Sequence, residues 1–231
     1  LELGFELFQG FFYTRPEVMR GRGLSPGLLH TLTLLNLLSD PAVPQGDVAD
    51  AFKSDADLTL RLIRMANAAA VGAREVGSIG HAISLLGRSP LHRWLALIFA
   101  ASAGEGRPTR AELLRSTLTR ARFCESLAEH TYYRDPGEAF LVGLFSRIEP
   151  LLDTPLPEIL AHVRLAPSVV EALTTDSGPL AWTLDLAQAH ERADWPAALD
   201  LLQAHGLTPV QLSEAYLEAL SWTRGAVEAL A

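Results

Sequence analysis

Seven histidines and one cysteine are the residues whose chemistry could support catalysis or metal binding. No two histidines are three or four residues apart, the spacing that places two ligands on one helix face. His190 and Asp194 have that spacing, but a solvated polar face explains this pair better than a metal site. The nearest histidine to Cys124 is His130, six residues away, which favours a buried, unreactive thiol. These residue types predict no bound metal and no catalytic group.

Arginines offer a different possibility, the binding of an anion. Arg61, Arg64, Arg88 and Arg93 lie in one stretch of the chain and could donate to a phosphate or a nucleotide. Glycine-rich phosphate loops of the GxxxxGK[ST] and GxGxxG types are absent from the sequence. A solvated surface is therefore the alternative explanation for these four side chains.

Composition restricts the partners that the chain can have. Its 231 residues carry a net charge of −8, which disfavours the phosphate backbone of a nucleic acid polymer. Although 48% of the residues are hydrophobic, the longest apolar run, Trp94–Ala101, is far shorter than the roughly 20 residues of a membrane span. A single cysteine excludes an internal disulfide and suits a reducing cytoplasm. The apolar excess without a membrane points to a protein partner.

Helix-start signals recur along the chain and predict an all-α body. These signals are Ser25-Pro26 and the capping boxes Thr109–Glu112, Asp135–Glu138 and Thr208–Gln211. The expected helices are 26–39, 46–53, 56–71, 79–87, 90–103, 110–131, 137–151, 156–163, 167–175, 179–192, 196–204 and 209–230. The apolar pattern predicts that helix 56–71 is sandwiched, with Leu58 and Leu62 on one side and Leu60 and Ile63 on the other. It also predicts that helix 137–151 is central and nearly dry.

Three stretches together resemble the HDOD domain, the HD-related output domain of bacterial signalling proteins. They are DADLTLRLIRMANAA (55–69), VGSIGHAISLLGRSPLHRWL (76–95) and AFLVGLFSRIEPLL (139–152). The resemblance implies an HD-like multi-helix bundle. We expect an HDOD domain over residues 24–231, with a core at 24–152 and a helical extension at 153–231.

The first residues read differently, as short aromatic runs separated by glycine and proline, which is typical of a strand and loop. Residues 4–16 resemble the end of an EAL domain, a barrel that hydrolyses cyclic di-GMP. Gln9 matches a glutamine near the EAL active site, and the other EAL metal ligands are not in the sequence. The resemblance implies that residues 1–23 are an EAL remnant and linker without phosphodiesterase activity.

The HDOD resemblance also concerns a metal site. HD hydrolases carry an adjacent His-Asp pair that binds the metal, and the matching residues here are Ser146 and Arg147. An arginine has no lone pair for a cation and would repel it. We therefore expect a protein that is not an enzyme and holds no metal and no cofactor.

The signature positions of the resemblance are the candidate binding residues. They are Arg61, Arg64, Asn67, Ser78, Gly87 and Trp94. Each also has a structural explanation: Asn67 can bond backbone groups, Ser78 can begin a helix, Gly87 can end it with positive φ, and Trp94 can lie in the core.

Three functions follow as hypotheses. The first is a signalling output module of cyclic di-GMP pathways that binds a partner protein, the EAL domain or a second copy of itself. The alternative is a sensor of a nucleotide or small anion that uses the degenerate HD-type cleft, with Arg61, Arg64 or Arg93 as donors. A residual metal-dependent phosphohydrolase has the least support.

Overall fold

The computed structural model describes residues 24–69, 76–103, 108–131 and 133–230, and every regular element in these ranges is an α-helix. The strand and loop expected within residues 1–23 lie outside the described residues. The helices are α1 (Pro26–Ser39), α2 (Gln45–Lys53), α3 (Ala56–Ala69), α4 (Ile79–Leu86), α5 (Arg88–Ala103), α6 (Pro108–His130), α7 (Pro136–Phe145), α8 (Ile148–Leu152), α9 (Leu156–Leu160), α10 (Pro167–Thr174), α11 (Ala181–Glu191), α12 (Trp195–Ala204) and α13 (Pro209–Leu230).

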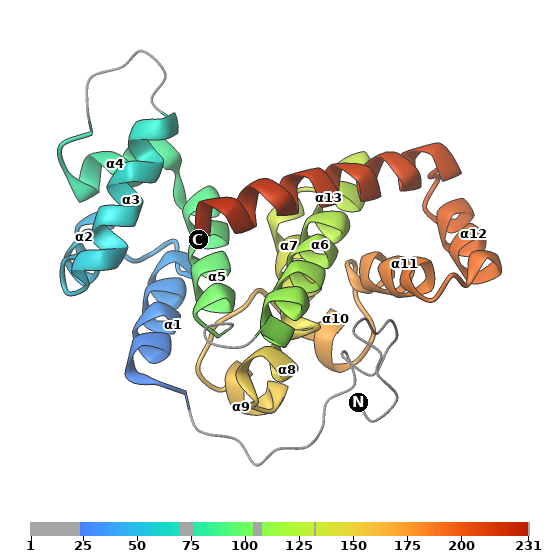
Figure 1. Ribbon diagram of the computed structural model, residues 1–231, viewed down its shortest axis with the longest axis horizontal. Coiled ribbons are helices and arrows are strands. Elements are labelled where there is room, and N and C mark those ends of the chain that lie inside the picture. The colour runs from blue at the N-terminus through green and yellow to red at the C-terminus, as the bar shows by residue number, and fades with distance from the viewer. Residues whose placement is uncertain (1–23, 70–75, 104–107, 132, 231) are drawn as a thin grey trace, which may run out of the picture.

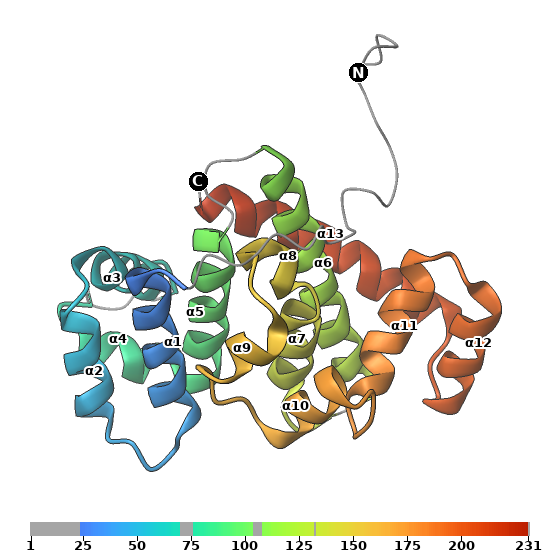
Figure 2. The ribbon, with the colours of Figure 1, turned by 90° about the horizontal axis from the view of Figure 1, so that it is seen from below.

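Figures 1 and 2 show an elongated helical body. The first five helices form one end, α6 and α7 form the middle, and α11 and α12 form the other end. The long helix α13 runs along the body and packs against α6. No described helix is long and apolar enough to cross a membrane.

The central position of α7 is confirmed. All seven residues from Ala139 to Phe145 are buried, and the helix packs closely against α6. Gly143 permits this approach, because a Cβ at that position would lie 2.6 Å from the Cα of Ala121 and 2.7 Å from the carbonyl oxygen of Arg120. The absence of a side chain at one position therefore sets the distance between the two central helices.

The expected helix 137–151 is two helices, so this prediction is wrong. Helix α7 ends at Phe145 and α8 begins at Ile148, with Ser146 and Arg147 between them. Pro150 provides the reason, because a proline lacks the N–H that would bond four residues back and its ring clashes with that carbonyl. Proline is tolerated in the first turn of a helix, and Pro150 lies in the first turn of α8.

Two helix starts agree closely with the capping prediction. The Ser25 Oγ accepts a hydrogen bond of 3.4 Å from the Leu28 N–H. The Thr208 Oγ1 accepts from the Gln211 N–H at 3.3 Å, and the Gln211 side chain accepts from the Thr208 N–H at 2.9 Å. The box expected at Thr109 is wrong, because α6 already begins at Pro108.

Helix α3 is buried on one side only. Leu58 and Leu62 lie in the core as expected, whereas Leu60 is 48% exposed. The prediction of a sandwiched helix is therefore wrong for its outer side, because no described element covers that face.

Candidate functional site

Three of the signature residues shape the connections around α4. The Asn67 Oδ1 accepts a hydrogen bond of 2.7 Å from the Val76 N–H. The Ser78 Oγ accepts from the His81 N–H at 3.2 Å at the start of α4. Gly87 ends this helix with a φ of +81°, a conformation that glycine adopts without strain. These contacts give Asn67, Ser78 and Gly87 the structural roles that the sequence allowed.

The other three signature residues lie apart. Trp94 is half-buried against the core. Arg61 donates to the Asp57 carboxylate at 2.8 Å on the surface, and Arg64 is exposed. Arg88 and Arg93 line a cavity that Arg61 and Arg64 do not border. The structure therefore does not bring the four candidate arginines together.

The residues that match the HD pair belong to an ionic cluster, which we call the Glu191 cluster: Arg120, Ser146, Arg147 and Glu191. The Arg147 Nη2 donates to the Glu191 Oε2 at 2.7 Å, and the Arg120 Nε donates to the Glu191 Oε1 at 2.8 Å. The Arg120 Nη1 also donates to the Ser146 Oγ at 3.0 Å. Two guanidinium groups therefore share one carboxylate at the junction of α6, α7 and α11.

The electrostatics of the Glu191 cluster oppose a cation. Burial lowers the pKa of Arg147, the nearby Arg120 charge lowers it further, and Glu191 acts in the opposite direction. The only carboxylate is already bonded to both arginines, so the donor set does not fit a metal ion. Within the described ranges there is also no group of three or more His, Cys, Asp or Glu residues that could hold one.

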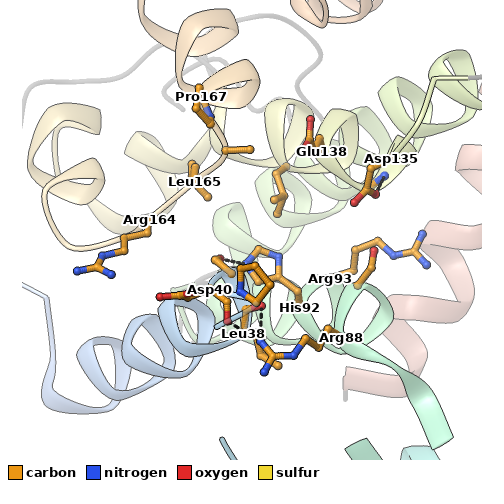
Figure 3. A pocket seen from close by; sticks show the side chains of 16 residues that line it. Leu38, Asp40, Arg88, His92, Arg93, Asp135, Glu138, Arg164, Leu165 and Pro167 are labelled. Atoms are coloured by element: carbon orange, nitrogen blue, oxygen red, sulfur yellow. Dashed lines mark hydrogen bonds between the residues drawn. The ribbon is translucent and has the colours of Figure 1, made fainter. Parts of the chain in front are cut away.

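A cavity of about 600 Å³ lies between the end of α1, the start of α5, the start of α7 and the segment before α10 (Figure 3). Polar and charged side chains meet there with a few apolar ones. The charged and imidazole groups of its lining include Arg88, His92, Arg93, Asp135, Glu138 and Arg164.

Arg88 builds the wall of this cavity instead of facing a ligand. Its Nη1 donates to the Asp40 carbonyl at 2.7 Å, and its Nη2 donates to the Val43 carbonyl. Carbonyl groups at the end of a helix lack partners within that helix. The guanidinium therefore closes the end of α1 and fixes the turn that follows it.

His92 is a neutral group of the cavity. Its Nε2 lies 2.9 Å from the Ser39 Oγ. Burial lowers the His92 pKa to about 4, and the Asp135 carboxylate opposes that shift only in part. A neutral imidazole beside a hydroxyl can accept or donate one hydrogen bond, but it adds no positive charge near neutral pH.

The Glu138 carboxylate of the cavity is bound to neighbouring groups. Glu138 accepts from the Tyr133 hydroxyl at 3.1 Å and from the Ser168 Oγ at 2.6 Å. It therefore does not reach back to Asp135, as a complete capping box would require. Burial raises the pKa of Tyr133, and the Glu138 charge adds to that shift.

On the opposite wall the Asn36 amide joins α1 to the segment before α10, an arrangement that we call the Asn36 clamp. The Asn36 side chain donates to the His162 carbonyl at 2.9 Å and accepts from the Arg164 N–H at 2.6 Å. The Arg164 guanidinium is exposed and has no partner among the residues that the structure describes. Arg93 pairs with Glu125, although its side chain is still 34% exposed.

Sequence reasoning found only part of this cavity. It named Arg88 and Arg93 but not His92, Glu138 or Arg164 as site residues. The i,i+3 and i,i+4 spacing of Ser89 with His92 and Arg93 was a usable signal, because it places these side chains on one face of a helix. Arg164 offered no local signal, since only the fold brings it to the cavity.

The family model of the HDOD domain matches residues 26–165, and the chain belongs to this family. Two solved structures resemble it over 91% of its length: a putative phosphohydrolase from Shewanella amazonensis, with a TM-score of 0.62, and an HDOD domain protein of unknown function from Geobacter sulfurreducens, with a TM-score of 0.57. The matches cover 95% and 94% of the two solved chains. The sequence identities are only 20% and 18%, so these structures show the fold alone.

Two curated relatives are more similar in sequence. The chain is 30% identical over 223 residues to the cyclic di-GMP phosphodiesterase CdgJ of Vibrio cholerae, which covers 96% of this chain and 51% of CdgJ. It is also 30% identical over 228 residues to the uncharacterized protein YuxH of Bacillus subtilis, which covers 98% of this chain and 55% of YuxH. The chain therefore spans about half the length of each relative.

The name of CdgJ contradicts the expectation that the protein is not an enzyme, and that expectation is wrong. The expectation rested on Ser146 and Arg147, which concern only one site in the HDOD fold. The chemistry at that site does not bear on the activity of the half of CdgJ that lies outside the match.

Proposed function

We propose that this chain is the regulatory half of a cyclic di-GMP phosphodiesterase, in which the HDOD helices act through contacts with other protein surfaces. The match to CdgJ over nearly the whole chain carries the proposal. The resemblance of residues 4–16, including Gln9, to the end of an EAL domain supports an EAL domain as the catalytic half.

The distribution of exposed apolar side chains supports a role in protein contacts. Of the eight large apolar side chains that are exposed in the described residues, five lie on α12 and α13. They are Trp195, Leu199, Val210, Leu217 and Leu220. An excess of exposed apolar side chains on two consecutive helices favours a protein interaction site over an evenly solvated surface.

The test is cyclic di-GMP hydrolysis by the natural protein in its full length. We expect hydrolysis, and we expect the double substitution Trp195→Ala/Leu199→Ala on α12 to change its rate by about fivefold or more, the range of ordinary coupling between sites. The control is Leu60→Ala, because Leu60 on α3 is 48% exposed and each of the two α12 side chains is 52% exposed. The proposal is contradicted if the protein does not hydrolyse cyclic di-GMP, or if the α12 substitutions leave the rate of hydrolysis unchanged.

A second candidate function is the sensing of a nucleotide or small anion in the cavity of Figure 3. The observation that favours it is the exposed Arg164 guanidinium at the edge of this cavity, which has no partner among the residues that the structure describes. A planar guanidinium can donate two parallel hydrogen bonds to a phosphate group.

Calorimetry with cyclic di-GMP and GMP distinguishes this candidate. Sensing requires a dissociation constant below about 1 mM, and Arg164→Ala should then weaken binding by about tenfold or more. Arg64→Ala is the matched control, because Arg64 is an exposed arginine outside the cavity. No binding below that limit, or equal effects of the two substitutions, contradicts sensing at this site.

A further inference from the structure

The outer face of α13 carries an exposed stripe at regular helical spacing. The inner face of the helix is buried against the body through residues such as Leu212, Ala215 and Ala219. Each outer residue except the last has another one three or four positions further on, the spacing at which one helix lies along another. The exposed stripe consists of Val210, Ser213, Glu214, Leu217, Leu220, Ser221, Arg224 and Glu228.

The stripe has an approximate two-fold pattern along the helix axis. Leu217 and Leu220, which are 64% and 42% exposed, lie equally far from the point midway between Glu218 and Ala219. Glu214 and Arg224 lie on either side of the same point, within one residue of exact symmetry, which corresponds to about 1.5 Å of helix rise. A helix that runs in the opposite direction would therefore meet each of these residues at the level of its counterpart.

The two charges of the pattern have no partner of their own. Neither Glu214 nor Arg224 forms an ion pair with any residue that the structure describes. The neighbouring Glu218, in contrast, is held by Arg122 and by Ser126. Opposite charges therefore flank the two leucines and are free to pair with another molecule.

We propose that two copies of this chain associate through antiparallel contact of their α13 helices. Leu217 of one copy packs against Leu220 of the other, and each Glu214 faces an Arg224. Such an interface is isologous, since the same patch serves both copies and each contact occurs twice. A parallel arrangement would place equal charges opposite one another, so the charge pattern favours the antiparallel one.

The surroundings of the stripe suit a second helix. Leu220 and Arg224 also border a cavity of about 750 Å³ between α6 and α13, so that side of the stripe is hollowed. Gly225 lies in the same part of α13, and apart from the backbone of its own helix and its chain neighbours no described heavy atom lies within 4 Å of the place that its Cβ would take. A glycine inside a helix is unfavourable, and packing among the described residues gives no reason for it here.

Sedimentation equilibrium of the 231-residue chain tests this proposal. We expect a dimer with a dissociation constant below about 100 μM, as suits a small interface. Leu217→Glu should weaken association at least about tenfold, because each dimer would then bury two unpaired carboxylates. Leu220→Glu should act similarly. Leu85→Glu on α4 is the matched control, since Leu85 is 42% exposed, as Leu220 is.

Charge reversal tests the antiparallel geometry. Glu214→Arg or Arg224→Glu alone should weaken the dimer about tenfold, because two like-charge pairs replace two attractive ones. The double substitution Glu214→Arg/Arg224→Glu should restore the affinity of the natural chain to within about threefold, since each pair is rebuilt with its signs exchanged. Circular dichroism checks that every variant keeps its helices.

Three results would overturn the proposal. One is a natural chain that stays monomeric at about 100 μM, a concentration at which at least half of the chains should be in dimers. Another is a dimer that is indifferent to Leu217→Glu. The third is a double charge reversal that associates no better than the single ones. None of these readouts involves cyclic di-GMP, so they are independent of the proposed function.

Discussion

Arg147 and Glu191, 44 positions apart in the chain, are joined by a hydrogen bond of 2.7 Å between Nη2 and Oε2. The same carboxylate also accepts from Arg120, so two positive charges share one negative charge, and Arg120 is only 8% exposed. Removing one partner of a buried ionic group costs far more than removing an exposed one, because the remaining charge stays desolvated.

Replacing this carboxylate should therefore destabilise the fold. We expect Glu191→Gln to lower the free energy of unfolding by about 3 kcal/mol, since both guanidinium groups lose their counter-charge. The control Asp57→Asn breaks the exposed Arg61–Asp57 pair and should cost less than about 0.5 kcal/mol. Urea unfolding measures both, and equal costs would show that the Glu191 cluster does not stabilise the protein.

Gly143 should tolerate no side chain. A methyl group there would lie 2.6 Å from the Ala121 Cα, which is backbone and cannot move aside without separating α6 from α7. We expect Gly143→Ala to cost about 3 kcal/mol by overpacking, measured by thermal or urea unfolding. Gly46→Ala on α2 is the control, because nothing lies within 4 Å of its Cβ position and alanine is the better helix former. A Gly143→Ala protein as stable as the control would refute the close-packing argument.

His92 should make stability depend on pH. Its pKa is lowered from 6.5 to about 4, so the unfolded chain takes up a proton in a range where the folded protein does not. Stability contributed by the neutral imidazole is therefore present above pH 6.5 and is lost as the pH falls to about 4, on the order of 3 kcal/mol in total.

Urea unfolding across that pH range measures the effect. The substitution His92→Gln should flatten the dependence, while His190 and His205, whose pKa values are also lowered by burial, are unchanged in the variant. His81→Gln replaces an exposed histidine and should leave the slope as it is. A slope that His92→Gln does not reduce would contradict the assignment.

Cys124 should be inert in the folded protein. It is buried, and burial raises the pKa of its thiol to about 12, so almost no reactive thiolate forms near neutral pH. We expect reaction with a disulfide reagent only at the rate of unfolding, and full reaction in denaturant. Fast reaction under native conditions would mean that the core around α6 opens easily.

Much of the fold was predictable because its signals are local. Caps such as Ser25 and Thr208 act within three residues, and the helices that begin at Pro26 and Pro209 match the predicted starts. The apolar composition of α7 was sufficient to predict its burial. The break after Phe145 was missed, although Pro150 was a usable local signal for it.

The candidate site was less predictable because its parts come from distant segments. The sequence could indicate that Arg147 does not bind a metal, but not that Glu191 on α11 would hold it. Arg61 and Arg93 look equivalent in the sequence, yet the fold pairs Arg61 with Asp57 on its own helix and Arg93 with Glu125 on α6. Only the tertiary arrangement distinguishes such residues.

The Asn36 clamp has a consequence for folding kinetics. Asn36 meets the Arg164 N–H across 128 positions of the chain, so the amide finds its partner only after most of the HDOD helices have been synthesised. Contacts between distant segments are slow to form, because the intervening chain must be ordered first. We therefore expect the cavity wall to close late, after α1 has already packed on α5.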